Sequence, residues 1–220
     1  MTSPARRHKQ FIAAQQSASQ SEAATMSHLN HYELLLFKLK QDLDRLHGVE
    51  SHLTKAEMKR KMLPTYMPWV AGVLQNGSGV QDAVLMRVLV WLLDVGDLKA
   101  ALDIAEYAIR HDLVVTDGFS RSTTCMIAEE VAAAVQRNMT ASAPLDTVQL
   151  VRAQQLLTGQ DMPDKVKARL FKFVAYAQRQ DGDNVLALDN LNKALVIDKD
   201  SGVKNDIKQL EKLVNSTTGS

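Results

Sequence analysis

The apolar run from Ala83 to Val95 is the stretch that most restricts how this chain can fold. Only Arg87 and Asp94 interrupt it, so a helix formed here has no face free to meet water, and other helices must enclose it. A membrane span is the rival interpretation, but the run falls well short of the roughly 20 apolar residues that a bilayer requires. We therefore predict a buried core helix.

A second helix is predicted after the tight turn Val95-Gly96-Asp97. Apolar residues recur at helical spacing from Leu98 onward, with charged residues between them, which is typical of an amphipathic helix. The apolar positions are Leu98, Ala101, Leu102, Ala105, Ala108 and Ile109. The stretch 82–112 therefore predicts an α-hairpin.

Residues 182–198 repeat the pattern of residues 96–112 at a constant offset of 86 positions. Gly182-Asp183 corresponds to Gly96-Asp97, and small alanines recur at matching places, which permits close helix approach as in tetratricopeptide hairpins. The offset is far longer than the tetratricopeptide period of about 34 residues. We therefore predict two hairpins of this type, at 82–112 and 165–198, with other helices between them.

Composition supports an all-α fold. Hydrophobic residues make up 45% of the 220 positions, Gly and Pro number only 10 and 5, and no alternating β-branched run indicates a strand. We predict a coiled-coil-like N-terminal helix followed by a helical bundle. The single Cys125 cannot form an intrachain disulfide, and no apolar segment follows the first charges, so a cytosolic protein is expected.

The chain is expected to divide into four parts. A flexible basic arm occupies residues 1–27, because its polar, low-complexity composition cannot bury enough apolar area to order the chain. A heptad helix and a basic helix occupy 28–62, where DNA contact or oligomerisation is expected. An α-helical core domain occupies 63–214, and a polar tail occupies 215–220.

A heptad pattern runs from Leu29 to Leu53 and predicts one long helix weakened at Gly48. The heptad seam consists of Leu29, Tyr32, Leu36, Leu39, Leu43 and Leu46. The seam either packs on the rest of the chain or pairs with other subunits. A second apolar flank at Leu34, Leu35 and Phe37 suggests that both occur, so we name the seam as the candidate oligomerisation surface.

Basic residues gather at the front of the chain. Residues 1–61 hold ten Lys/Arg against six Asp/Glu, whereas the remainder holds sixteen against nineteen. Such cations can bind DNA phosphates with release of counterions, or they can form an ordinary solvated surface. The candidate DNA-binding residues are Arg6, Arg7 and Lys9 in the arm, and Lys55, Lys59, Arg60 and Lys61 in a helix predicted to begin at the capping box Thr54-x-x-Glu57.

Two prolines, Pro64 and Pro68, predict the end of one helix and the start of the next. Between and after them, Tyr66 and Trp69 are expected to pack as core anchors, although aromatic residues beside cations can also stack on nucleic-acid bases.

Four segments in the same order resemble one family of viral proteins. They are the opening TSPARRH, KRKMLPTYMPWVAGVL from Lys59, GDLKAALDIAEYAIRHDL from Gly96, and DMPDKVKARL from Asp161. Together they are similar to the small terminase subunit (M protein) family of Peduoviridae-type tailed phages, also described as terminase endonuclease subunits. The resemblance covers nearly the whole chain.

The resemblance implies a function in packaging phage DNA in the host bacterial cytoplasm. It implies binding of the cohesive-end (cos) site on double-stranded phage DNA, recruitment and regulation of a large ATPase terminase subunit, and a ring-shaped homo-oligomer. Family members often end in a long Lys/Arg-rich tail. This sequence ends at Ser220 without one, so we expect DNA contacts at the front of the chain.

An endonuclease of the metal-dependent type requires carboxylates or histidines around a cation. Asp44 and Glu57 are weak catalytic candidates, because Glu57-x-Lys59 resembles a restriction-type pattern but falls in predicted helix rather than strand. The His28-Leu29-Asn30-His31 cluster lacks further ligands. Gly77-Ser78-Gly79 lacks the lysine of a phosphate-binding loop.

We therefore expect no catalytic residue, metal site or cofactor, with Mg²⁺ required only if the chain is itself the endonuclease that cuts cos DNA. That enzyme is one alternative function. A tetratricopeptide-like protein–protein adaptor that does not bind DNA is another.

Overall fold

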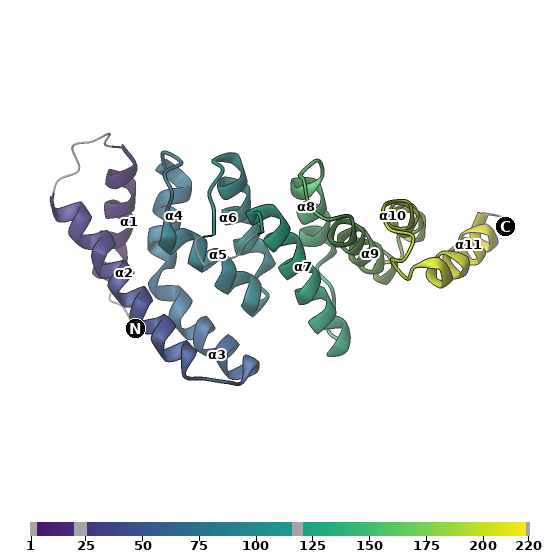
Figure 1. Ribbon diagram of the computed structural model, residues 1–220, viewed down its shortest axis with the longest axis horizontal. Coiled ribbons are helices and arrows are strands. Elements are labelled where there is room, and N and C mark those ends of the chain that lie inside the picture. Colours follow the sequence, from purple (N-terminus) through teal and green to yellow (C-terminus); the bar gives the residue numbers. More distant parts are fainter. Residues whose placement is uncertain (1–3, 20–25, 116–120, 219–220) are drawn as a thin grey trace. The chain divides into compact units, whose positions relative to one another are not determined.

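A computed structural model describes residues 4–19, 26–115 and 121–218. These residues form eleven α-helices and one 3-10 helix, with no strand among them, so the predicted all-α class is confirmed (Figure 1). The chain separates into two compact units, Met1–Ser120 and Arg121–Ser220. The core domain predicted over 63–214 includes residues of both units and stays a prediction.

Unit 1 contains six α-helices and the 3-10 helix. They are α1 (Pro4–Ser19), α2 (Met26–His47), α3 (His52–Met62), η1 (Leu63–Thr65), α4 (Met67–Asn76), α5 (Ala83–Val95) and α6 (Leu98–Arg110). Unit 2 contains α7 (Thr123–Thr140), α8 (Thr147–Leu157), α9 (Asp164–Gln180), α10 (Asn184–Ile197) and α11 (Lys204–Thr218).

Helix α5 is the predicted core helix and forms the centre of unit 1. Eight of its thirteen residues are buried, because α2, α3, α4 and α6 all pack against it. Its first turn is capped by the Asp82 carboxylate, which accepts a hydrogen bond from the Leu85 amide at 2.9 Å. The buried residues of α5 are Val84, Leu85, Met86, Val88, Leu89, Trp91, Leu92 and Leu93.

The two hairpin turns predicted at Gly96 and Gly182 have the same backbone structure. Both glycines adopt positive φ, of 82° and 90°, which glycine accepts without steric cost. The Asp97 amide donates to the Leu92 carbonyl at 3.0 Å, and the Asp183 amide donates to the Gln178 carbonyl at 2.9 Å. The repeat at offset 86 is therefore a repeat of local structure.

Tyr66 and Trp69 are core residues, as predicted for anchors at the proline-flanked helix junction. Both are buried. The Trp69 indole nitrogen donates to Asp82 Oδ2 at 2.8 Å, and its ring stacks on Tyr32 with the centroids 5.2 Å apart. The Tyr66 hydroxyl donates to Asp42 Oδ2 at 2.7 Å. Because these rings are enclosed, they do not form a surface for base stacking.

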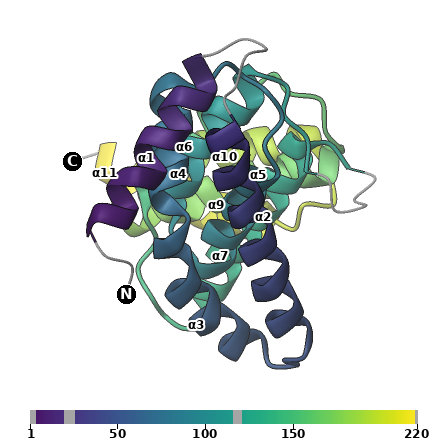
Figure 2. The ribbon, with the colours of Figure 1, turned by 90° about the vertical axis from the view of Figure 1, so that its left-hand side faces the viewer.

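The N-terminal part of the chain differs from its prediction. Pro4–Ser19 is helix α1, which packs against α4, whereas a flexible arm had been expected over 1–27 (Figures 1 and 2). Ordering is possible because α4 offers an apolar neighbour that the arm's own composition does not reveal. Residues 1–3 and 20–25 lie outside the described part.

The predicted heptad helix is also shorter than expected. Helix α2 ends at His47, immediately before Gly48, and α3 begins at His52 after its N-cap, Ser51. The Ser51 hydroxyl accepts from the Thr54 amide at 3.3 Å, so Ser51 caps the helix and Thr54 does not. Leu53 therefore leaves the heptad seam, and 82% of its surface is exposed.

Unit 2 is assembled around α9, which packs against α7, α8 and α10, while α11 packs against α10. A buried amide chain crosses three of these helices: Gln154 donates to Asn190, which donates to Gln178, both at 2.8 Å. The apolar core between α9, α10 and α11 consists of Ala175, Ala187, Leu191, Val203, Ile207 and Leu210. Helix α11 extends to Thr218, into the predicted polar tail.

Within the described ranges, no helix combines the length and apolar character needed to cross a membrane.

Candidate nucleic-acid interface

Helix α3 carries the four cations predicted to contact DNA, and two of them bind α5. Lys59 Nζ lies 2.5 Å from Asp94 Oδ2, and Arg60 donates to the Val95 carbonyl at 3.3 Å. Both partners belong to the last turn of α5, where unpaired carbonyls and the helix dipole favour positive charge. Lys59 and Arg60 therefore hold α3 against α5, while Lys61 remains exposed.

The structure brings two of the α3 cations to one pocket of about 340 Å³ between α2, α3 and α5. Lys55 and Lys59 line it together with Arg87, a half-buried residue of α5, and His47 of α2. The sequence had shown Arg87 only as an interruption of an apolar run. The only sequence signal for a role of Arg87 was the presence of a charged residue within a helix predicted to be buried.

Arg6, Arg7 and Lys9, the other predicted DNA contacts, are exposed on α1. In both views of the ribbon, the N-terminal end of α1 lies at the end of α4 where α3 joins it (Figures 1 and 2). The cations of α1 are therefore held on an ordered helix that packs against α4.

The weak catalytic candidates do not form a carboxylate pair. Asp44 lines the same pocket as Lys55, whereas Glu57 is exposed on α3 and does not line it. Among the described residues, no three His, Cys, Asp or Glu side chains are grouped so that they could hold a metal ion. Burial and the nearby Glu129 raise the pKa of the Cys125 thiol, which disfavours the nucleophilic thiolate.

The predicted oligomerisation seam packs largely within its own unit. Leu39 and Leu46 are buried, and the Tyr32 hydroxyl accepts from the Ala83 amide at 3.1 Å. Leu36 and Leu43 are partly exposed, and the side chain of Leu29 lies outside the described part. The exposed apolar side chains of α2 are instead Leu34 and Phe37, at 66% and 62%.

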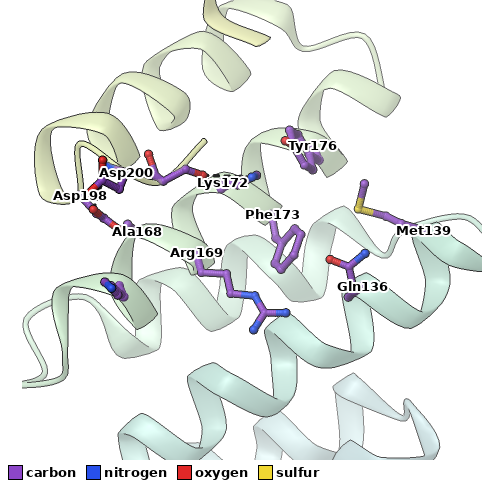
Figure 3. A pocket seen from close by; sticks show the side chains of 11 residues that line it. Gln136, Met139, Ala168, Arg169, Lys172, Phe173, Tyr176, Asp198 and Asp200 are labelled. Carbon is purple, nitrogen blue, oxygen red and sulfur yellow. Dashed lines mark hydrogen bonds between the residues drawn. The ribbon is translucent and has the colours of Figure 1, made fainter. Parts of the chain in front are cut away.

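Helix α9 carries the highest net positive charge of any helix, with five Lys/Arg against one Asp. The sequence analysis had placed the DNA candidates only in the first 61 residues. In the structure, Lys165, Arg169 and Lys172 of α9 line a pocket of about 490 Å³ in unit 2 (Figure 3). Their spacing of four and three residues places them on one helix face, which was visible in the sequence.

Comparison with known proteins identifies the family. Residues 36–165 match the model of the phage small terminase subunit family. The chain is 42% identical over 212 residues to the "Terminase, endonuclease subunit" of Escherichia phage P2, covering 96% of this chain and 85% of that protein.

A more distant relative is the "Probable terminase, endonuclease subunit" of Haemophilus phage HP1, which is 24% identical over 227 residues, covering 96% of this chain and 81% of the relative. No solved structure matches the chain. The predicted family is confirmed: the chain belongs to the phage small terminase subunit family, whose role is in DNA packaging.

Proposed function

We propose that this chain binds the cohesive-end site of phage DNA and recruits and regulates a large ATPase terminase subunit, as a ring-shaped homo-oligomer in the host bacterial cytoplasm. The observation that carries the DNA part is the gathering of Lys55 and Lys59 with Arg87 around one open pocket of unit 1. Phosphate oxygens are the groups that such a cluster of cations attracts.

The cations of unit 1 have two separate tasks in this proposal. Lys59 and Arg60 fix α3 to α5, so their charges are partly compensated by Asp94 and by the carbonyl of Val95. Lys55 and Lys61 on α3, with Arg6, Arg7 and Lys9 on α1, then supply most of the contacts to the DNA backbone. Such contacts position a duplex without reading its bases.

A salt titration tests the DNA part. We expect Lys55→Glu with Lys61→Glu to weaken binding of a cos duplex roughly tenfold and to reduce the salt dependence by about two phosphate contacts. The matched control reverses Lys99 and Arg110, two exposed cations of α6 in the same unit. Equal affinity of the test variant, the control and the unmodified protein would exclude α3 as the interface.

The endonuclease alternative is favoured by the names of both relatives and by one observation, the presence of Asp44 beside Lys55 in the same pocket. A carboxylate beside a lysine could hold Mg²⁺ next to a bound phosphate. Asp44→Ala and Glu57→Ala should be assayed for cos cleavage with purified large subunit and Mg²⁺. Loss of cleavage with DNA binding retained would favour the enzyme, and unchanged cleavage would remove both residues from catalysis.

The adaptor alternative predicts that even the unmodified protein does not bind a cos duplex at low salt. Retained binding of the large subunit in the same preparation would then identify the chain as a protein–protein adaptor.

A further inference from the structure

The pocket on α9 is built differently from the cationic pocket of unit 1. Its lining includes Phe173 and Tyr176 of α9 and Met139 of α7, so apolar surface is present beside the cations. Asp198 and Asp200, after α10, line another part of its wall. Figure 3 shows these two carboxylates on one side and Gln136 and Met139 of α7 on the other.

Two of the three cations of this pocket contact aromatic rings. The guanidinium of Arg169 lies 5.3 Å from the centroid of Phe173, and Lys172 Nζ lies 5.7 Å from that of Tyr176. Lys172 also donates to the Ser201 carbonyl at 3.1 Å. Cation–π contact fixes the position of a charge without neutralising it, so the charge remains available for an anion.

The same cations differ from others of unit 2 in their ion pairing. Among the described residues, Lys165, Arg169 and Lys172 form no ion pair, although other cations of the unit do, such as Arg179 with Asp206. The hydroxyl of Ser201, in the pocket wall, is buried without a hydrogen-bond partner in that described part. Unpaired charges and an unsatisfied hydroxyl indicate a site that is completed by a ligand.

The chemistry of the walls favours a polypeptide over DNA. A duplex presents a continuous row of phosphates, which Asp198 and Asp200 would repel, and it offers no apolar side chain for Met139 and Phe173. An acidic protein segment can place one carboxylate against Arg169, where bidentate hydrogen bonds are possible, and an apolar side chain against Met139 and Phe173. It can also keep its own donors opposite the two aspartates.

We propose that the α9 pocket binds an acidic segment of a partner protein, with a carboxylate on Arg169 and Lys165 and an apolar or aromatic side chain against Met139 and Phe173. This inference rests on the proposed function, in which the chain recruits the large ATPase subunit, and it assigns that recruitment to unit 2, apart from the DNA cations of unit 1.

The test uses the full chain with three probes: the purified large subunit of the same phage, a random copolymer of glutamate and tyrosine, and a cos duplex. The Lys165→Glu/Arg169→Glu variant should bind both polypeptide probes roughly tenfold more weakly, with DNA affinity changed by less than about twofold. Met139→Gln should weaken both polypeptide probes severalfold and leave DNA binding unchanged, because it removes only apolar contact. Met139 is 40% exposed, so the fold should tolerate this change.

The matched control is Lys208→Glu/Lys212→Glu, two exposed lysines of α11 that do not line the pocket. It should bind every probe like the unmodified protein. A loss of DNA binding in Lys165→Glu/Arg169→Glu, with polypeptide binding intact, would overturn the proposal in favour of a phosphate surface. Unchanged binding of all three probes would also overturn it.

Failure of the proposed function has a different signature. The unmodified protein could bind the copolymer but not the large subunit, with the Lys165→Glu/Arg169→Glu variant binding neither. This result would support the α9 pocket as a site for acidic peptides and would exclude recruitment of the large subunit. If the unmodified protein binds neither polypeptide, the inference itself is overturned.

Discussion

At the scale of single residues, the Asp82 carboxylate joins α2, α4 and α5 of unit 1. It caps α5 and accepts from the Trp69 indole at 2.8 Å and from the Tyr32 hydroxyl at 3.4 Å. Burial and the negative charge of Asp82 raise the pKa of Tyr32 to about 12. Burial also raises the pKa of Asp82 itself, although its hydrogen bonds oppose this shift.

Asp82→Ala should lower the free energy of unfolding by about 2–4 kcal/mol, because the cap is lost and the buried Trp69 N–H is left without its acceptor. Urea unfolding followed by circular dichroism measures the change. Asp97→Ala removes the exposed cap of α6, whose carboxylate accepts only from the Ala100 amide, and should cost about 1 kcal/mol. Equal losses in the two variants would contradict this account of Asp82.

The raised pKa of Asp82 also predicts a pH effect. Its pKa in the folded state lies above the ordinary value of an aspartate, so the folded state binds this proton more tightly than the unfolded state. Asp82 therefore stabilises the fold more as pH falls and less as pH rises. Asp82→Asn removes the titration while keeping an acceptor. We therefore subtract the unfolding free energy of the unmodified protein from that of Asp82→Asn. This difference should decrease as the pH is lowered from 7 to 4. An increase would mean that the pKa of Asp82 is lowered in the folded state.

At the scale of helices, the attachment of α3 to α5 includes one partly buried ion pair. Lys59 and Asp94 are 15% and 29% exposed, whereas Lys99 and Asp103 on α6 are 74% and 40% exposed. Burial reduces screening by water, so the first pair should contribute more to stability than the second.

A double-mutant cycle with Lys59→Met and Asp94→Leu should give a coupling energy of about 1 kcal/mol, since the pair is partly shielded and hydrogen-bonded. The same cycle at Lys99 and Asp103 should give about 0.3 kcal/mol, as is usual for an exposed pair one helical turn apart. A coupling at Lys59 no larger than that of the control pair would mean that the Lys59–Asp94 pair does not hold α3 against α5.

The two Gly-Asp turns should respond equally when their glycines are replaced. An added Cβ at Gly96 or Gly182 would meet no atom within 4 Å, but both residues have positive φ. Gly96→Ala and Gly182→Ala should therefore each cost about 1 kcal/mol from backbone strain alone. Gly48→Ala, at a glycine without positive φ, should cost little. Thermal unfolding of the three variants measures this, and clearly unequal losses at Gly96 and Gly182 would contradict the structural equivalence of the turns.

At the scale of the whole molecule, the question is whether subunits associate and through which surface. The heptad seam contributes to the core of its own unit at Leu39 and Leu46, so it is only partly available to another subunit. Leu34 and Phe37 of α2 remain exposed and lie one helical turn apart. Exposed apolar side chains adjacent on a helix are the usual means of association between helices.

Native mass spectrometry should therefore show a homo-oligomer, and Leu34→Glu/Phe37→Glu should reduce its subunit number, because each charge would have to be buried in the interface. Val114→Glu, at another exposed apolar residue of unit 1, is the control and should leave the assembly intact. A strict monomer of the unmodified protein at micromolar concentration would contradict the proposed ring.

The sequence by itself determined the helical class, the buried α5 and the paired Gly-Asp turns. All of these depend on residues within a few positions of one another, so apolar periodicity and turn chemistry are sufficient to predict them. The same local rules misplaced the start of α3, because Ser51 and Thr54 are both acceptable caps and only the end of α2 at His47 decides between them.

Only the tertiary structure decided which charges are free to bind a partner. Lys59 meets Asp94 across 35 positions and Tyr32 meets Asp82 across 50, and no short pattern in a sequence predicts such contacts. Packing likewise enclosed part of the heptad seam, brought Arg87 to the cations of α3, and gathered Lys165, Arg169 and Lys172 with Met139 and Asp198 around one pocket. The physical reason is that charge availability depends on neighbours in space, which the order of residues along the chain does not specify.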